Sequence, residues 1–172
     1  MAQRFRGESV HKVDGKGRVS IPAQFRRVIE AGDPAWADGL APFVTIVYGG
    51  KQRDFLEAYT EEAIADVDAR IERLPRGSKE RRAMEHFFNG QSVRMQIDDT
   101  GRLVLSQKLR DKIDIAGEAY FIGSGDTFQI WAPKGFDDKN ADIEEFLDSF
   151  GDDFDPLTLL EGTDAPATPA GE

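Results

Sequence analysis

The sequence predicts an α+β protein with a mainly β core and helices around it. One stretch occurs twice, at residues 14–26 and 98–110, with a constant offset of 84 positions. Segments typical of strands flank both copies, and segments with helical periodicity follow them. Neither half has enough strands to bury both faces of a sheet. We therefore expect the halves to interleave into one small barrel-like sheet with a pseudo-two-fold axis.

The two copies keep the same residue types where a turn meets a strand. The matching pairs are Asp14 and Asp98, Gly17 and Gly101, Arg18 and Arg102, Ile21 and Leu105, Phe25 and Leu109, and Arg26 and Arg110. Lys16 differs, because the second copy has Thr100 at that position. Recurrence of the aspartate and the arginine indicates a structural role for that pair, whereas Lys16 is free to specialise.

The first half is expected to form several strands and one helix. Gly15 and Gly17 permit a tight turn with positive φ, and Pro22 ends a strand and suits the first turn of a helix. Gly49 and Gly50 predict a hairpin after the most strand-like run of the chain. The expected order is strand 9–13, turn 15–17, strand 19–21, helix 23–31, strand 43–48 and a return strand near 53–57.

The second half repeats this plan, with strands at 119–122 and 127–131 joined by a turn at 123–126. Two helices are expected between the halves. Thr60 is placed to cap the first, whose apolar residues recur at helical spacing up to Leu74, and Ser78 is placed to cap the second. A third helix is expected at about 133–150.

Composition restricts the function classes. No apolar run approaches the roughly 20 residues that a membrane span needs, and residues 1–14 lack the pattern of a signal peptide. We therefore expect a cytoplasmic protein. The chain has no cysteine and two isolated histidines, which argues against a disulfide, a metal site or a bound cofactor.

The charge is unevenly distributed along the chain. The net charge is −10, yet residues 1–27 hold seven Lys or Arg against two carboxylates. Residues 134–172 hold two Lys against twelve carboxylates. Because charges beyond about 8–10 Å are screened at physiological salt, the basic front end is compatible with a DNA partner.

The first glycine turn is the sharpest functional signal. Lys16, Gly17 and Arg18 place two cations where the backbone can approach a partner, and an arginine fork matches the major-groove edge of guanine. The alternative for Arg18 is a structural pair with Asp14. Arg4 and Arg6, just ahead of the turn, either reach DNA or aid solubility.

Other charged residues carry weaker signals. Arg26, Arg27, Lys108 and Arg110 follow the repeated strands and are expected on a solvated helix face. The cations between 73 and 82 are expected to pair with nearby glutamates or with the acidic tail of a neighbouring copy. No catalytic constellation is visible: Asp98 and Asp99 are adjacent and face different ways, and no Walker pattern is present.

The duplicated pattern, Asp-x-Lys-Gly-Arg at 14–18 and Asp-x-x-Gly-Arg at 98–102 with Phe5-Arg6-Gly7 in front, resembles the MraZ family of bacterial transcriptional regulators. The resemblance covers about residues 1–147. It implies a double swapped-hairpin barrel of the AbrB/SpoVT type built from two internal repeats. It also implies a ring-shaped homo-oligomer, usually an octamer, that associates with the nucleoid.

The resemblance further implies binding to short direct repeats of double-stranded DNA upstream of the division and cell-wall gene cluster, commonly with repression of its own operon. The DNA-contacting role attaches to Lys16, Gly17 and Arg18, with Arg6 close by and Arg102 as the counterpart in the second copy. Ser106 departs from the pattern, which favours proline there and so predicts a looser strand-to-helix boundary.

On this basis we expect a first repeat at 1–57, a helical connection at 58–90, a second repeat at 91–133, a helix at 134–150 and an acidic, disordered tail at 151–172. The resemblance assigns the tail nothing. The alternative hypothesis is an antitoxin-like protein-interaction module that uses this acidic tail. An enzyme is not expected.

Overall fold

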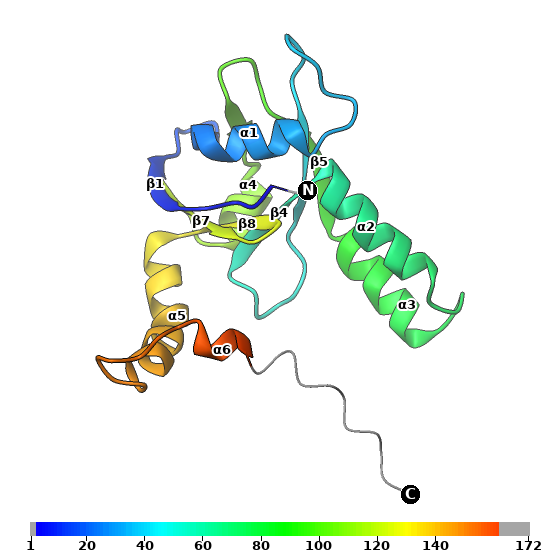
Figure 1. Cartoon of the computed structure of the whole chain (residues 1–172). Helices are drawn as coiled ribbons and strands as arrows, with labels where there is room; N and C mark the ends of the chain where they lie inside the picture. Colours follow the sequence, from blue (N-terminus) through cyan, green and yellow to red (C-terminus); the bar gives the residue numbers. More distant parts are fainter. Residues whose placement is uncertain (1–2, 162–172) are drawn as a thin grey trace, which may run out of the picture. The chain divides into compact units, whose positions relative to one another are not determined.

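Six antiparallel strands form the main sheet (Figure 1). In the computed structural model, which describes residues 3–161, the strand order is β1-β7-β8-β4-β3-β5. The strands are β1 Glu8–Lys12, β3 Phe43–Val47, β4 Phe55–Thr60, β5 Ser92–Gln96, β7 Glu118–Ser124 and β8 Thr127–Trp131. A separate two-stranded sheet pairs β2 Arg18–Ser20 with β6 Arg102–Val104. The chain is therefore α+β with a mainly antiparallel core.

The strand order follows the internal repeat. β1, from the first half, pairs with β7 of the second half, and β5, from the second half, pairs with β3 of the first. The two hairpins, β3–β4 and β7–β8, meet along the pair β4–β8 at the centre of the sheet. Each hairpin therefore takes its outer partner from the other half of the chain.

The small sheet shows the same reciprocity at single residues. Val19 lies opposite Leu103, its equivalent in the repeat, so the pseudo-two-fold axis passes between them. The Ile21 backbone N–H donates to the Gly101 carbonyl at 2.9 Å, and the equivalent Leu105 N–H donates to Gly17 at 2.8 Å. The two repeated turns are thus held against each other by matching hydrogen bonds.

The helices confirm most sequence predictions. They are α1 Ala23–Ala31, α2 Glu61–Glu72, α3 Lys79–Met84, the π-helix η1 Glu85–Gly90, α4 Gln107–Lys112, α5 Pro133–Asp148 and α6 Thr158–Glu161. Thr60 caps α2 by accepting the Ala63 N–H at 3.0 Å, and Ser78 caps α3 by accepting from Arg81 at 3.2 Å. Figure 1 shows α2 and α3 running alongside each other as a helical hairpin.

The hydrophobic core joins both halves. It contains inward side chains of the main sheet, the buried residues of β2 and β6, and one face each of α1 and α4. The rings of Phe5, Phe25 and Phe128 pack with centroids 5.0–5.3 Å apart. Phe5 is 3% exposed and is held by a hydrogen bond from its N–H to the Gly125 carbonyl at 2.7 Å. The N-terminal segment is therefore anchored in the core.

Three local features differ from the sequence predictions. The return strand β4 begins at Phe55 and reaches Thr60, because the preceding turn extends to Arg53, whose backbone N–H donates to the Gly50 carbonyl at 3.1 Å. The second connecting helix changes from α-helical to π-helical geometry at its end and finishes as η1. Ser106 gives a defined helix start rather than a loose one, since its hydroxyl accepts the Leu109 N–H at 3.4 Å.

The chain divides into two units, residues 1–137 and 138–172, of which residues 3–161 are described. The predicted tail at 151–172 is described as far as Glu161 and contains α6, with Phe154 stacked on Phe150 at 4.2 Å. Residues 162–172, for which the sequence also predicts disorder, lie outside the described part. Among the described helices, none has the length and apolarity to cross a bilayer.

Candidate nucleic-acid interface

Turn 1, residues 14–18, is organised by one carboxylate. Asp14 Oδ1 accepts the backbone N–H groups of Lys16 and Arg18, both at 2.9 Å. Asp14 Oδ2 accepts from Arg18 Nε at 2.6 Å. The Arg18 backbone N–H, followed by its side chain, holds the pKa of Asp14 below the ordinary value of 3.8. The carboxylate thus fixes both the turn and the base of the Arg18 guanidinium.

Turn 2, residues 98–102, repeats this arrangement. Asp98 Oδ1 accepts the N–H groups of Thr100 and Arg102 at 3.0 and 2.8 Å, and Oδ2 lies 3.3 Å from Arg102 Nε. The Arg102 backbone N–H is the main cause of the lowered pKa of Asp98. The two hypotheses for Arg18, a structural pair with Asp14 and a contact to DNA, are therefore compatible. The arginine pairs with its aspartate, and 40% of its side chain remains exposed.

Each turn is wedged against the other repeat at its glycine. Gly17 has φ +84°, and a Cβ there would lie 2.0 Å from the Leu105 carbonyl oxygen. Gly101 has φ +79°, and a Cβ there would lie 2.6 Å from Arg26 Nη1. The absence of a side chain lets the backbones approach closely, as hydrogen bonding between the turns requires.

The β2–β6 pair has one buried apolar face and one exposed face. Val19 and Leu103 point inward and are at most 1% exposed. The cross-strand pairs Arg18–Val104 and Ser20–Arg102 alternate with them and point outward. We call these four outward residues the ladder face. Its two arginines lie diagonally across the strands, and a two-stranded ribbon is an element that the DNA major groove admits.

The turns differ in their local charge. Lys16 is exposed, whereas the hydroxyl of the equivalent Thr100 donates to Asp98 Oδ1 at 2.8 Å. Turn 2 also borders a cavity of about 230 Å³ whose lining contains three carboxylates, Asp98, Asp99 and Glu30, and one cation, Arg26. Residues 39–42, from a loop that the second repeat lacks, line it as well. A polyanion is therefore better accommodated at turn 1.

The predicted site residues fall into two groups. Lys16, Gly17, Arg18 and Arg102 lie together on the two turns and the ladder face. Arg6 is exposed ahead of β1, and a five-residue strand spans about 17 Å, so β1 separates it from turn 1.

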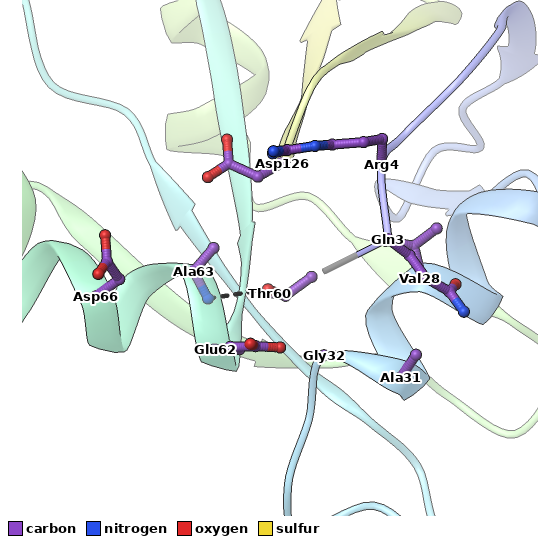
Figure 2. A pocket seen from close by; sticks show the side chains of 10 residues that line it. All are labelled: Gln3, Arg4, Val28, Ala31, Gly32, Thr60, Glu62, Ala63, Asp66 and Asp126. Carbon is purple, nitrogen blue, oxygen red and sulfur yellow. Dashed lines mark hydrogen bonds between the residues drawn. The ribbon is translucent and has the colours of Figure 1, made fainter. Parts of the chain in front are cut away.

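Arg4 lies elsewhere in the fold. It lines a cavity of about 340 Å³ together with Glu62, Asp66 and Asp126 (Figure 2). The carboxylates that line this cavity belong to α2 and to the β7–β8 turn. Arg4 therefore adds no positive charge to the ladder face.

The sequence predicts Arg26 and Arg110 on a solvated helix face, and this prediction is wrong. Arg26 and Arg110 are half-buried, and each packs beside the turn glycine of the other repeat. Arg110 Nε donates to the Leu105 carbonyl at 3.0 Å, while Arg26 Nε is buried without a partner among the described residues. Their identity at the 84-residue offset was the signal that could have revealed this role.

Two further observations concern the chemistry of the site. Among residues 3–161, no group of three or more His, Asp or Glu side chains is arranged to hold a metal ion. Arg27 and Lys108 are exposed, and Lys108 Nζ lies 3.2 Å from the Tyr48 hydroxyl. What the turns offer a partner is therefore exposed cations on a backbone fixed by hydrogen bonds.

Comparison with known proteins gives the chain a family. A family model described as "MraZ protein, putative antitoxin-like" matches residues 88–152. A protein of Ruegeria sp. named "Transcriptional regulator MraZ" is 60% identical over 163 residues, which are 94% of this chain and 98% of the relative. Proteins of the same name are 44% identical in Cereibacter sphaeroides, covering 95% of this chain and 99% of the relative, and 33% identical in Desulfosudis oleivorans, covering 90% and 99%. The chain belongs to the MraZ family.

Proposed function

We propose that this protein is a sequence-specific DNA-binding transcriptional regulator that represses its own promoter. It binds short direct repeats of double-stranded DNA as a ring-shaped homo-oligomer, in the cytoplasm at the nucleoid. The observation that carries the proposal is the ladder face, where Arg18 and Arg102 lie on one exposed surface above buried Val19 and Leu103. The relatives named as transcriptional regulators support the same role.

The proposed fold is a double swapped hairpin of the AbrB/SpoVT type. Its support is the strand order, in which each hairpin pairs with a strand from the other half. In that arrangement both turns belong to one surface, so a single copy offers two arginines to the groove. Several copies in a ring would bind successive repeats by avidity, and each single turn would need only modest affinity.

In this proposal turn 1 is the principal reader. Asp14 holds Arg18 through Nε, so this ion pair does not use the two Nη groups, which can donate to a guanine or a phosphate. Lys16 adds a mobile cation next to it, and Arg110 lies beside Gly17. Arg102 is the weaker counterpart, because Thr100 brings no charge, turn 2 contains a second carboxylate in Asp99, and Glu30 lines the same cavity.

The repeat supplies a matched pair of variants for the test. Arg18→Ala and Arg102→Ala remove the same side chain from equivalent positions, and each breaks an exposed ion pair of small energetic value. Promoter binding is measured by fluorescence anisotropy against a scrambled duplex at several salt concentrations. Arg18→Ala is expected to weaken promoter binding by at least about tenfold and to flatten its salt dependence. Arg102→Ala is expected to weaken binding less.

Two controls separate reading from folding and from general charge. Arg27→Ala removes an exposed cation of α1 and should leave promoter binding within about twofold of the parent. Arg18→Lys keeps the charge but not the fork, so it should retain non-specific binding and lose preference for the promoter. Parent-like promoter affinity of a folded Arg18→Ala variant would overturn the assignment of turn 1.

A further inference from the structure

The second unit carries an exposed apolar stripe. Ile143, Phe146, Leu147 and Phe150 recur at the spacing of one helix face, and they are 39–54% exposed. Phe146 and Phe150 lie 5.1 Å apart, and Phe154 stacks on Phe150 at 4.2 Å. We call this stripe the acidic aromatic face. Contiguous exposed apolar side chains rimmed by polar residues are typical of interaction sites.

The charges around the stripe define the chemistry of its partner. Residues 138–161 contain nine carboxylates and one lysine, Lys139. This excess of negative charge repels DNA. Carboxylates bind guanidinium groups through paired hydrogen bonds, and phenylalanine rings attract them through cation–π contacts. The acidic aromatic face therefore fits a surface that is rich in arginine.

The chain itself exposes such a surface at the hairpin tip, residues 70–82. The tip contains six cations and two glutamates. Its exposed cations are Arg70, Arg73, Arg76, Lys79 and Arg82. The sixth, Arg81, is half-buried, and its Nη1 donates to the Leu74 carbonyl at 3.2 Å. Arg81 thus fixes the end of α2 against α3 and leaves the other cations facing outward on a rigid support.

We propose that the acidic aromatic face of one copy binds the hairpin tip of a second copy. In a single chain both surfaces are exposed: residues 141–153 are all exposed, and so are five cations of the tip. Each copy therefore offers one surface of each kind. Because the contact joins two different surfaces, its repetition links copies head to tail, which closes into a ring when the rotation between copies allows it.

This inference rests on the homo-oligomeric part of the proposed function and identifies its interface. It does not depend on DNA binding by turn 1. The assembly is therefore measured without DNA, so a failure of promoter binding and a failure of this interface give different results.

Charge reversal at the two surfaces provides the decisive experiment. In the full chain, Arg73→Glu with Arg76→Glu removes the net positive charge of the tip, and Glu144→Arg with Glu145→Arg halves the net negative charge of residues 138–161. Each double variant alone is expected to shift from the oligomer toward the 19.1 kDa single chain in size-exclusion chromatography with light scattering. An equimolar mixture is expected to form at least heterodimers, because the unchanged stripe of the tip variant then meets the unchanged tip of the stripe variant. Circular dichroism and thermal unfolding check that each variant is folded.

Cross-linking tests which copy supplies each surface. The chain has no cysteine, so single cysteines can be introduced without background. A tagged Leu147→Cys chain is mixed with an untagged Ala83→Cys chain, whose exposed cysteine directly follows the hairpin tip in α3, and is expected to give a covalent heterodimer with a short bismaleimide. Gln52→Cys, exposed between β3 and β4, replaces Ala83→Cys in the control and should not cross-link.

Four outcomes would overturn the proposal. The first is full assembly of both charge-reversed variants on their own, and the second is a mixture that stays as single chains. The third is cross-linking between positions 147 and 83 within one chain of a double-cysteine variant but not between chains. If the tip variant assembles normally and loses DNA affinity instead, the hairpin tip is a DNA contact and the inference is wrong.

Discussion

Gly17 and Gly101 lack a side chain, and atoms of the other repeat occupy the space that their side chains would fill. Leu105 and Arg26 lie where a Cβ at these glycines would be, and both glycines have a positive φ. Gly15 lies in the same turn without a positive φ, and a Cβ there would have no other atom within 4 Å apart from its chain neighbours. The two glycines of turn 1 therefore have different roles, although the sequence permits a turn at either.

Gly17→Ala is expected to lower the free energy of unfolding by at least about 2 kcal/mol. The reasons are the strain of a left-handed non-glycine residue and the overlap with the Leu105 carbonyl. Gly15→Ala is the matched control and should change stability by less than about 0.5 kcal/mol. Urea unfolding measures both, and equal stability of the two variants would show that the turns are not wedged together.

The residues of the candidate site were largely predictable, but their environment was not. The offset of 84 residues identified Asp14, Gly17 and Arg18 with their counterparts, because a duplicated turn repeats its own local hydrogen bonds. The half-burial of Arg26 and Arg110 depends on contacts between turns that lie far apart in the sequence. Helical periodicity cannot reveal such contacts.

At the scale of elements, the two repeats start equivalent helices in different ways. Pro22 precedes α1 and makes no side-chain cap, while Ser106 caps α4 through its hydroxyl. Strands and helices followed local propensity closely: α1 and β8 have the predicted bounds. The π-helix η1 was missed, because the spacing of apolar residues does not distinguish a π-helical turn from an α-helical turn at the end of a helix.

Ser106→Ala is expected to cost about 0.5–1 kcal/mol of stability, since it leaves the first turn of α4 without its side-chain acceptor. Ser20→Ala, an exposed serine of β2, serves as the comparison and should change stability by less than about 0.5 kcal/mol. Both are measured by urea unfolding at one pH. If the two variants unfold at the same urea concentration, the hydroxyl of Ser106 contributes nothing to the helix start.

At the scale of the molecule, the interleaved strands make the first unit one folding unit. Neither half holds a sheet of its own, because β1 and β5 each pair with a hairpin of the other half. Phe5 adds to this by packing on Phe25 of the first half and Phe128 of the second. The repeat predicted that the halves interleave, but which strand pairs with which depends on long-range packing.

Phe5→Ala is expected to destabilise the first unit by about 3–5 kcal/mol, as loss of a buried phenylalanine leaves a cavity. Unfolding should nevertheless remain a single transition. Trp36 and Trp131 lie in different halves, so Trp36→Phe and Trp131→Phe variants report on each half by fluorescence. Phe5→Leu, which keeps much of the volume, should cost less than about 1.5 kcal/mol. Separate midpoints for the two tryptophans would show that the halves fold independently.

The central pairing of β4 with β8 has a consequence for how the molecule comes together. A chain with only one repeat would find its strand partners on another molecule, and its folding would depend on protein concentration. The helical connection from α2 to η1 joins the two halves in one chain. Pairing of their strands is therefore a unimolecular step that does not depend on protein concentration. Two separately encoded but permanently joined halves are also free to diverge. One such difference is that Lys16 is exposed to solvent, whereas the equivalent Thr100 donates a hydrogen bond to Asp98. Two identical chains in a symmetric pair would have the same residue at both positions.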